Sequence, residues 1–183
     1  MASFVDMGKL AKDINYWPLG YQEPFETIAI EPLLKALNEI SGDTCLEIGC
    51  GNGYWTRKLL VPKFKKVIAV DIIEPLDFGF DYYQQDSLKD IPEVDAVYSF
   101  GVFCHLKRDE RMTYLLELRK ILKGKGLISF GNWQRHPGLT NAPNGSNGWY
   151  YDDVEIVDYM MKIVGFEWYD FDPSYRDTIA IIC

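Results

Sequence analysis

The chain has 183 residues, of which 48% are hydrophobic and 25% are charged. This composition is typical of a globular protein with a sizeable core, and it excludes a disordered or low-complexity chain. The formal net charge of −8 disfavours a nucleic-acid partner, because an acidic surface repels phosphate backbones.

The order of the residues disfavours three further classes of protein: membrane-spanning, secreted and metal-binding. No apolar run approaches the roughly 18–20 residues that cross a bilayer, and the N-terminus lacks the apolar stretch of a signal peptide. The four cysteines and two histidines show no metal-binding spacing. We therefore expect a cytoplasmic protein with no metal site and no contact with a membrane.

Residues 1–43 are predicted to form a helical N-terminal lead-in within a single domain that covers residues 1–183. Between residues 28 and 40, apolar side chains recur at spacings of three and four, which predicts an amphipathic helix. Pro32 falls in the first turn of that helix, where proline is tolerated, and Gly42 follows its end. Residues 44–183 are predicted to be the core of the domain.

Strand-like and helix-like segments alternate along this core. Strands are predicted at residues 44–48, 66–71, 83–86, 94–100, 126–131, 166–171 and 178–182, and helices at 54–60, 108–122 and 152–164. The alternation predicts an α/β fold in three layers, with a mostly parallel seven-stranded sheet covered by helices on both faces. Only a short turn joins the last two strands, so they form a C-terminal antiparallel hairpin.

A glycine-rich turn between the first strand and the next helix carries the strongest functional signal. Gly49, Gly51 and Gly53 alternate there, which permits a tight turn and leaves room for a ligand against bare backbone. The dinucleotide-binding pattern Gly-x-Gly-x-x-Gly would need its third glycine at the position of Tyr54. A carboxylate at Glu47 suits a cationic ligand with an ammonium group and a sulfonium, whereas it would repel a pyrophosphate.

Two further acids end later strands. Asp71 ends the second strand, 18 residues after Gly53, where a carboxylate can accept hydrogen bonds from both ribose hydroxyls. A helix cap or turn is the alternative explanation for this aspartate. Asp86, followed by Ser87, ends the predicted third strand. It could hydrogen-bond an adenine amino group or cap the next turn.

Taken together, these residues resemble the class I S-adenosylmethionine-dependent methyltransferases. Residues 94–106 resemble that family's fourth strand and the following loop, and residues 119–126 resemble the turn before its fifth strand. Residues 164–167 resemble a late junction between helix and strand, and the closing hairpin agrees with the family's reversed seventh strand. The resemblance covers about residues 40–183.

The resemblance implies a cofactor site for S-adenosyl-L-methionine, with S-adenosyl-L-homocysteine as the product. The methionine part would be held by Glu47, Gly49, Gly51 and Gly53. Asp71, with Ile72 beside it, would bind the ribose, and Asp86 and Ser87 would bind the adenine. Ser99 and Phe100 would line the sulfonium side. The family has no universal catalytic residue.

Acceptor-binding residues can be suggested from position alone. His136 follows the fifth strand, at the edge of the sheet where ligands bind, and its neutral imidazole could accept a proton near pH 7. An ordinary surface histidine is the alternative. Tyr16 and Trp17 could belong to a lid, and Trp133 and Tyr150 could wall an acceptor pocket. Aromatic packing is the alternative explanation for all four.

The expected activity is methyl transfer from S-adenosylmethionine to an unidentified acceptor, and the short acidic chain favours a small molecule. Methylases of DNA amino groups tend to carry Asn/Asp-Pro-Pro-Tyr/Phe after the fourth strand, where this chain has Ser99-Phe100-Gly101-Val102. A protein or peptide methyltransferase and a non-catalytic S-adenosylmethionine-binding partner subunit are alternatives. A nicotinamide-dependent oxidoreductase is disfavoured by Glu47 and Tyr54.

Overall fold

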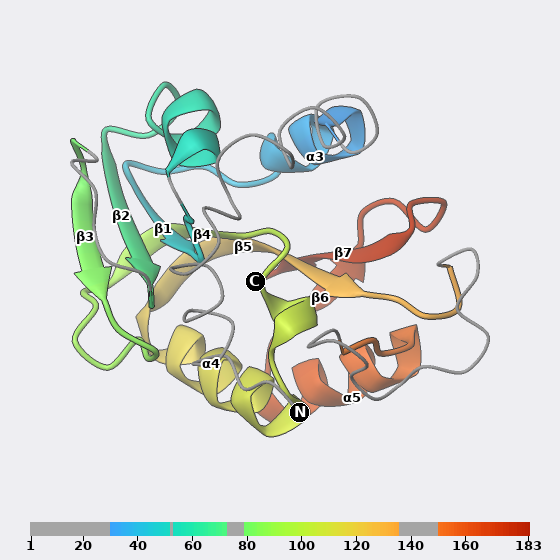
Figure 1. The fold of residues 1–183 in the computed structure, drawn as a ribbon. Helices are drawn as coiled ribbons and strands as arrows, with labels where there is room; N and C mark the ends of the chain where they lie inside the picture. Colours follow the sequence, from blue (N-terminus) through green and yellow to red (C-terminus); the bar gives the residue numbers. More distant parts are fainter. Residues whose placement is uncertain (1–29, 52, 73–78, 136–149) are drawn as a thin grey trace, which may run out of the picture.

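The computed structural model describes residues 30–51, 53–72, 79–135 and 150–183 (Figure 1). The strands are β1 (Thr44–Ile48), β2 (Lys66–Asp71), β3 (Asp81–Gln84), β4 (Val94–Ser99), β5 (Leu122–Gly131), β6 (Trp168–Asp170) and β7 (Asp177–Ile182). The helices are α3 (Ile30–Leu37), a π-helical segment (Thr56–Leu60), a 3₁₀ turn (Phe103–His105), α4 (Arg108–Ile121) and α5 (Val154–Val164).

The seven strands form one sheet in the order β3-β2-β1-β4-β5-β7-β6. Neighbouring strands from β3 to β5 are parallel, whereas β7 runs antiparallel to both β5 and β6. In Figure 1, α3 and the π-helical segment lie over one face, and α4 and α5 cover the other. The predicted three-layer α/β fold with its antiparallel C-terminal hairpin is therefore confirmed.

Apolar side chains on both faces of the sheet hold the three layers together. One cluster joins the sheet to α4 and α5 and includes Leu46, Ile48 and Leu115. The other lies beneath α3 and includes Leu33 and Cys45. Because successive residues of β1 point to opposite faces and both faces are buried, the strand reads as a nearly continuous apolar run.

Local sequence signals fix the ends of α5. The Asp153 side chain accepts a hydrogen bond from the Ile156 backbone N–H at 2.8 Å, which satisfies one of the free donors of the first turn. At the other end, Gly165 adopts a left-handed conformation with φ of 84°, which glycine reaches without strain. The helix therefore begins two residues later than predicted, and it ends where expected.

Five strands differ from the prediction at their ends: β4 and β7 by one residue, and β3, β5 and β6 by two or more. β3 begins at Asp81, two residues early, because its register is set by β2; Asp81 also pairs with Lys66 of that strand at 2.9 Å. β5 begins at Leu122, four residues before its predicted start, and includes Gly124. A Cβ on Gly124 would lie 2.3 Å from the Asp95 carbonyl oxygen, so glycine permits this close strand pairing.

The two helices of the α3 face also differ from the prediction. α3 ends at Leu37, three residues before the predicted end. The helix after the glycine turn widens, because the Val61 N–H donates to the Thr56 carbonyl five residues earlier, at 2.9 Å. Pro62 follows at once and has no N–H with which to continue the helix. None of the helices in the described residues has the length and apolar character that a bilayer crossing requires.

Candidate functional site

The glycine turn lies at the carboxyl end of β1, where parallel strands of such a sheet present their ligand-binding edge. Gly49 packs closely against the segment after β4, since a Cβ there would come within 2.0 Å of Val102 Cγ2. Gly51, with φ of 54°, faces open space: apart from its own chain neighbours, no described residue has an atom within 4 Å of the position of its missing Cβ. The turn is thus closed on one side and accessible on the other.

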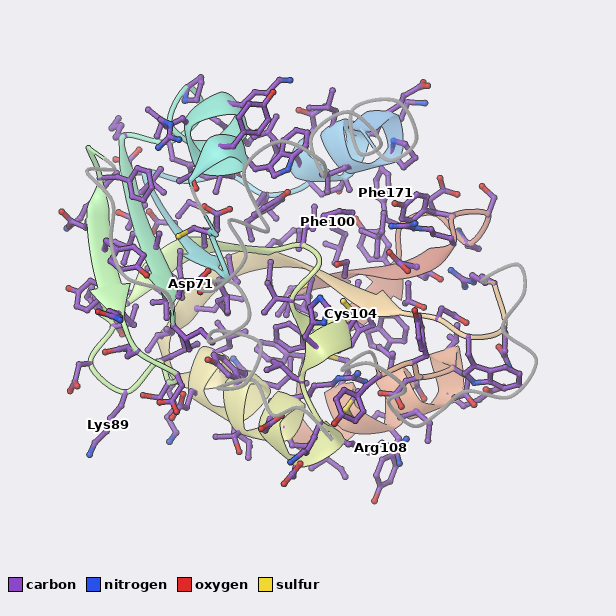
Figure 2. The ribbon with its side chains drawn as sticks, in the orientation of Figure 1. Asp71, Lys89, Phe100, Cys104, Arg108 and Phe171 are labelled. Atoms are coloured by element: carbon purple, nitrogen blue, oxygen red, sulfur yellow. The ribbon has the colours of Figure 1, made fainter. Side chains whose placement is uncertain are left out.

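Asp71 connects the end of β2 to this turn. One carboxylate oxygen, Oδ2, accepts a hydrogen bond from the Gly51 N–H at 2.8 Å, and Oδ1 accepts one from the Ile72 N–H at 2.7 Å. The aspartate is buried, and Figure 2 shows it at the end of its strand, on the edge of the sheet that the glycine turn shares. The structure brings together these two parts of the predicted cofactor site.

Glu47 is the other acid of the site, and it is almost completely buried, at 3% exposure. Its carboxyl accepts a hydrogen bond from the Thr56 hydroxyl at 2.5 Å. Burial raises the pKa of Glu47 to about 8, and the nearby carboxylate of Asp71 adds to the increase, whereas the bond from Thr56 opposes it. The two acids of the site therefore differ in their contacts: a side-chain hydroxyl donates to the Glu47 carboxyl, whereas two backbone N–H groups donate to Asp71.

The end of β4 supplies the third side of the site. The buried Ser99 hydroxyl donates to the Ile48 carbonyl oxygen at 3.1 Å, which ties β4 to β1 just before the glycine turn. Phe100 is half-buried and packs against the core cluster beneath α3, as does Phe171 of the C-terminal hairpin. Both rings appear on that side of the sheet in Figure 2. Ser99 and Phe100 thus lie at the carboxyl edge of the sheet, and their predicted place on the sulfonium side of the cofactor stays a prediction.

Asp86 and Ser87 follow β3 on the outer side of the site. The Gln85 N–H donates to the Asp71 carbonyl oxygen at 2.9 Å, so the turn after β3 starts level with the end of β2. Asp86 is exposed and Ser87 is half-buried. Their predicted contact with the adenine stays a prediction.

The predicted acceptor residues are only partly within the described structure. His136, Tyr16 and Trp17 lie outside the described residues. Trp133 belongs to the turn after β5 and is half-exposed. The Tyr150 backbone N–H donates to the Cys104 carbonyl oxygen at 2.6 Å. The roles suggested for these residues stay predictions.

A buried ionic network near Tyr150 was missed by the sequence reasoning. Arg111 of α4 pairs with Asp152 and donates to the carbonyl oxygens of Phe103 and Tyr150, at 2.7 and 2.8 Å. A signal was present, because Arg111 falls on the buried stripe of α4 together with Tyr114, Leu115 and Leu118. A charged residue on an apolar stripe indicates a buried partner. Thr56, by contrast, carried no such signal.

Comparisons with known proteins agree with this geometry. Residues 46–130 match the family described as "Methyltransferase domain". A tRNA U34 carboxymethyltransferase of Cellvibrio japonicus (strain Ueda107) is 33% identical over 112 residues, which are 52% of this chain and 34% of the relative. A protein of the same name from Pseudomonas fluorescens (strain Pf0-1) is 25% identical over 150 residues, 70% of this chain and 46% of the relative. The chain thus spans a third to a half of the length of these relatives.

Solved structures support the fold. Magnesium protoporphyrin IX methyltransferase from Synechocystis PCC 6803, with bound S-adenosylmethionine, superposes with a TM-score of 0.65 at 13% identity and covers 98% of this chain and 96% of its own. A Burkholderia thailandensis 1,6-didemethyltoxoflavin-N1-methyltransferase gives a TM-score of 0.61 at 17% identity, covering 98% and 83%. These likenesses show that the chain has the fold of these methyltransferases, and its residues 46–130 match the methyltransferase domain family.

Proposed function

We propose that the protein transfers a methyl group from S-adenosylmethionine to a small-molecule acceptor. The observation that carries the proposal is the glycine turn that is open at Gly51, with the buried Glu47 carboxyl in the strand before it and Asp71 bonded to the Gly51 N–H. Open backbone at Gly51 leaves room for the cofactor. The two acids match the cationic and the hydroxyl-bearing parts of that ligand.

Each acid has a distinct role in this proposal. Asp71 would accept hydrogen bonds from the ribose hydroxyls, exchanging or sharing its present bond to the Gly51 N–H. Glu47 would face the ammonium group of the methionine part, and Ser99 and Phe100 would line the sulfonium side. The adenine would lie near Asp86 and Ser87, beyond the end of β3.

Methyl transfer from a sulfonium is an in-line displacement, so the protein contributes mainly by positioning the two reactants. A base is needed only where the acceptor must lose a proton. His136 is the proposed base, and Trp133 and Tyr150 are the proposed walls of the acceptor pocket. Replacing His136 by Gln should lower kcat while leaving the affinity for S-adenosylmethionine unchanged.

Charge supports a small acceptor over a nucleic acid. The formal net charge is −8, and several described lysines already have acidic partners. Such ion pairs are Lys65–Asp43 at 2.9 Å, Lys66–Asp81 at 2.9 Å and Lys123–Glu93 at 2.7 Å. A protein that binds a phosphate backbone needs unpaired basic groups along its contact surface.

Transfer to tRNA is the second candidate, because the curated relatives named above act on tRNA U34. Those relatives have one half to two thirds of their length outside the matched region. The tRNA-binding part of such a protein could therefore lie beyond the shared domain, and the shared domain supports both candidates.

One experiment tests the cofactor and then separates the acceptors. The purified protein is titrated by calorimetry with S-adenosylmethionine and S-adenosylhomocysteine, with NAD as the control ligand. It is then incubated with methyl-labelled cofactor and either total tRNA or a metabolite extract freed of macromolecules. We expect binding of the first two ligands only and label in the metabolite fraction. Label in tRNA that ribonuclease releases would favour the second candidate, and absence of cofactor binding would refute both.

A further inference from the structure

The Glu47 carboxyl lies inside the sheet, although it belongs to the ligand-binding region. In the spatial order of the sheet, β1 is the third of the seven strands. Glu47 pairs in register with Ala69 of β2 on one side and Tyr98 of β4 on the other. The residue is 3% exposed, two positions before the first glycine of the turn. An acid in such surroundings depends on the few groups that contact it, because burial penalises its charged form.

Thr56 is the one side chain, among the residues that the structure describes, that hydrogen-bonds the Glu47 carboxyl. Its hydroxyl donates to Oε2 at 2.5 Å, and Thr56 itself is fully buried. Thr56 begins the π-helical segment, whereas Glu47 precedes the glycine turn, so the contact joins the two sides of the turn. The bond thereby fixes the direction of the carboxyl group relative to the turn.

The other titratable groups around Glu47 give it no positive partner within the described part of the chain. They are Cys45 of β1, Cys50 of the turn, Asp71 of β2 and Tyr98 of β4, with Lys63 and Arg57 acting on the two cysteines. Burial raises the pKa of both cysteine thiols and of the Tyr98 hydroxyl, so these three are uncharged near neutral pH. With the pKa of Glu47 at about 8, its carboxyl is mostly protonated at pH 7.

We propose that Thr56 is a positioning residue for the cofactor, and that Glu47 releases its proton to solvent when the ammonium group of the cofactor binds beside it. This inference rests on the proposed function, because it requires S-adenosylmethionine in the site. The ammonium group is largely charged at pH 7 and supplies the positive partner of the carboxylate. The Thr56 hydroxyl continues to donate to the carboxylate after the proton has passed to the buffer.

Proton release can be counted by calorimetry at pH 7 in phosphate and in Tris, because the two buffers differ in their enthalpy of ionisation. With a pKa of about 8, most of the free protein carries the proton on Glu47 at pH 7. We therefore expect most of one proton to be released for each S-adenosylmethionine bound. The variant Glu47→Gln should release none. 5′-Methylthioadenosine, which lacks the amino-acid part, should release none from the wild-type protein.

Variants of Thr56 test the positioning role. Thr56→Val keeps the shape of the side chain and removes the hydroxyl, and it should weaken S-adenosylmethionine and S-adenosylhomocysteine by about fivefold or more. The affinity for 5′-methylthioadenosine should not change, and Thr56→Ser should restore wild-type binding. Thr113→Val is the matched control, because the Thr113 hydroxyl lies on the exposed face of α4 and donates to the Asp109 carbonyl oxygen.

The outcomes separate this inference from the proposed function. If the wild-type protein binds neither S-adenosylmethionine nor S-adenosylhomocysteine, the proposed function itself fails. If it binds them without proton release, or if Thr56→Val binds all three ligands as the wild type does, the inference is overturned. Circular dichroism reports whether Thr56→Val folds. Should it not fold, loss of proton release in Glu47→Gln and its retention in Thr56→Ser would support the inference, and any other pair of results would refute it.

Discussion

Replacing Asp152 by Ala should destabilise the protein by about 3–5 kcal/mol, because it leaves a buried guanidinium without its counter-charge. The Arg111 side chain is 1% exposed and that of Asp152 is 3% exposed. In the variant, Arg111 keeps its bonds to the carbonyl oxygens of Phe103 and Tyr150 but loses the anion. Burial already lowers the pKa of Arg111, and the charge of Asp152 opposes that change.

Equilibrium unfolding in urea measures this effect directly, and thermal melting checks it. For a domain of this size, each kcal/mol lowers the melting temperature by about 2–4 °C, so a decrease of about 6–20 °C is expected. Arg108→Ala is the matched control: Arg108 also contacts Asp152, at 2.8 Å, but its side chain is 56% exposed. Its loss should lower the free energy of unfolding by less than about 1 kcal/mol.

A third variant separates the cost of leaving Arg111 unpaired from the net contribution of the Arg111–Asp152 pair to stability. Arg111→Met combined with Asp152→Leu removes both charges, and most of the lost stability should return. The reasoning is refuted if Asp152→Ala changes the free energy of unfolding no more than Arg108→Ala does. It is also refuted if the double variant is less stable than Asp152→Ala.

Three further predictions concern the site. Gly49→Ala should abolish S-adenosylmethionine binding and lower the melting temperature, because its Cβ would lie 2.0 Å from Val102 Cγ2 at a φ of 79°; wild-type binding in this variant would contradict the steric argument. Asp71→Asn should weaken S-adenosylmethionine and 5′-methylthioadenosine alike, by about tenfold, in a calorimetric titration; an effect on only one of them would exclude a role at the shared ribose. The native state holds the Glu47 proton more tightly than the unfolded state does, since its pKa rises from 4.5 to about 8. The free energy of unfolding should therefore fall as pH rises through this range, and Glu47→Gln should show a smaller fall in urea titrations at several pH values.

The parallel centre of the fold could be predicted from the sequence with accurate ends. β1 and β2 have the predicted bounds, because both are buried on both faces and each reads as a short apolar run between turn residues. Among the described strands, β3 pairs with β2 alone, and its register depends on that strand. The early start of β5 depends on the approach of Gly124 to Asp95, which is a tertiary contact.

The candidate site, too, was predictable where it depends on local sequence and not where it depends on long-range contacts. The glycine turn and Asp71 could be found from residue type and position, because both sit at strand ends that the apolar pattern had already located. The bond from Thr56 to Glu47 spans nine positions and forms only when the turn folds back on β1. Arg111 and Asp152 are 41 positions apart, and nothing in their local sequence pairs them. Long-range polar contacts of this kind require the fold itself.

The two short outermost strands also bear on how the protein behaves at high concentration. β3 has four residues and β6 has three, so each edge strand of the sheet offers few unpaired backbone N–H and C=O groups. Asp81 adds a charge to the edge strand β3. The long apolar strands β4, β5 and β7 lie between these edge strands and are not available to pair with another molecule. Such short edge strands are poor templates for strand addition, so we expect the fold to resist edge-to-edge aggregation during expression and storage.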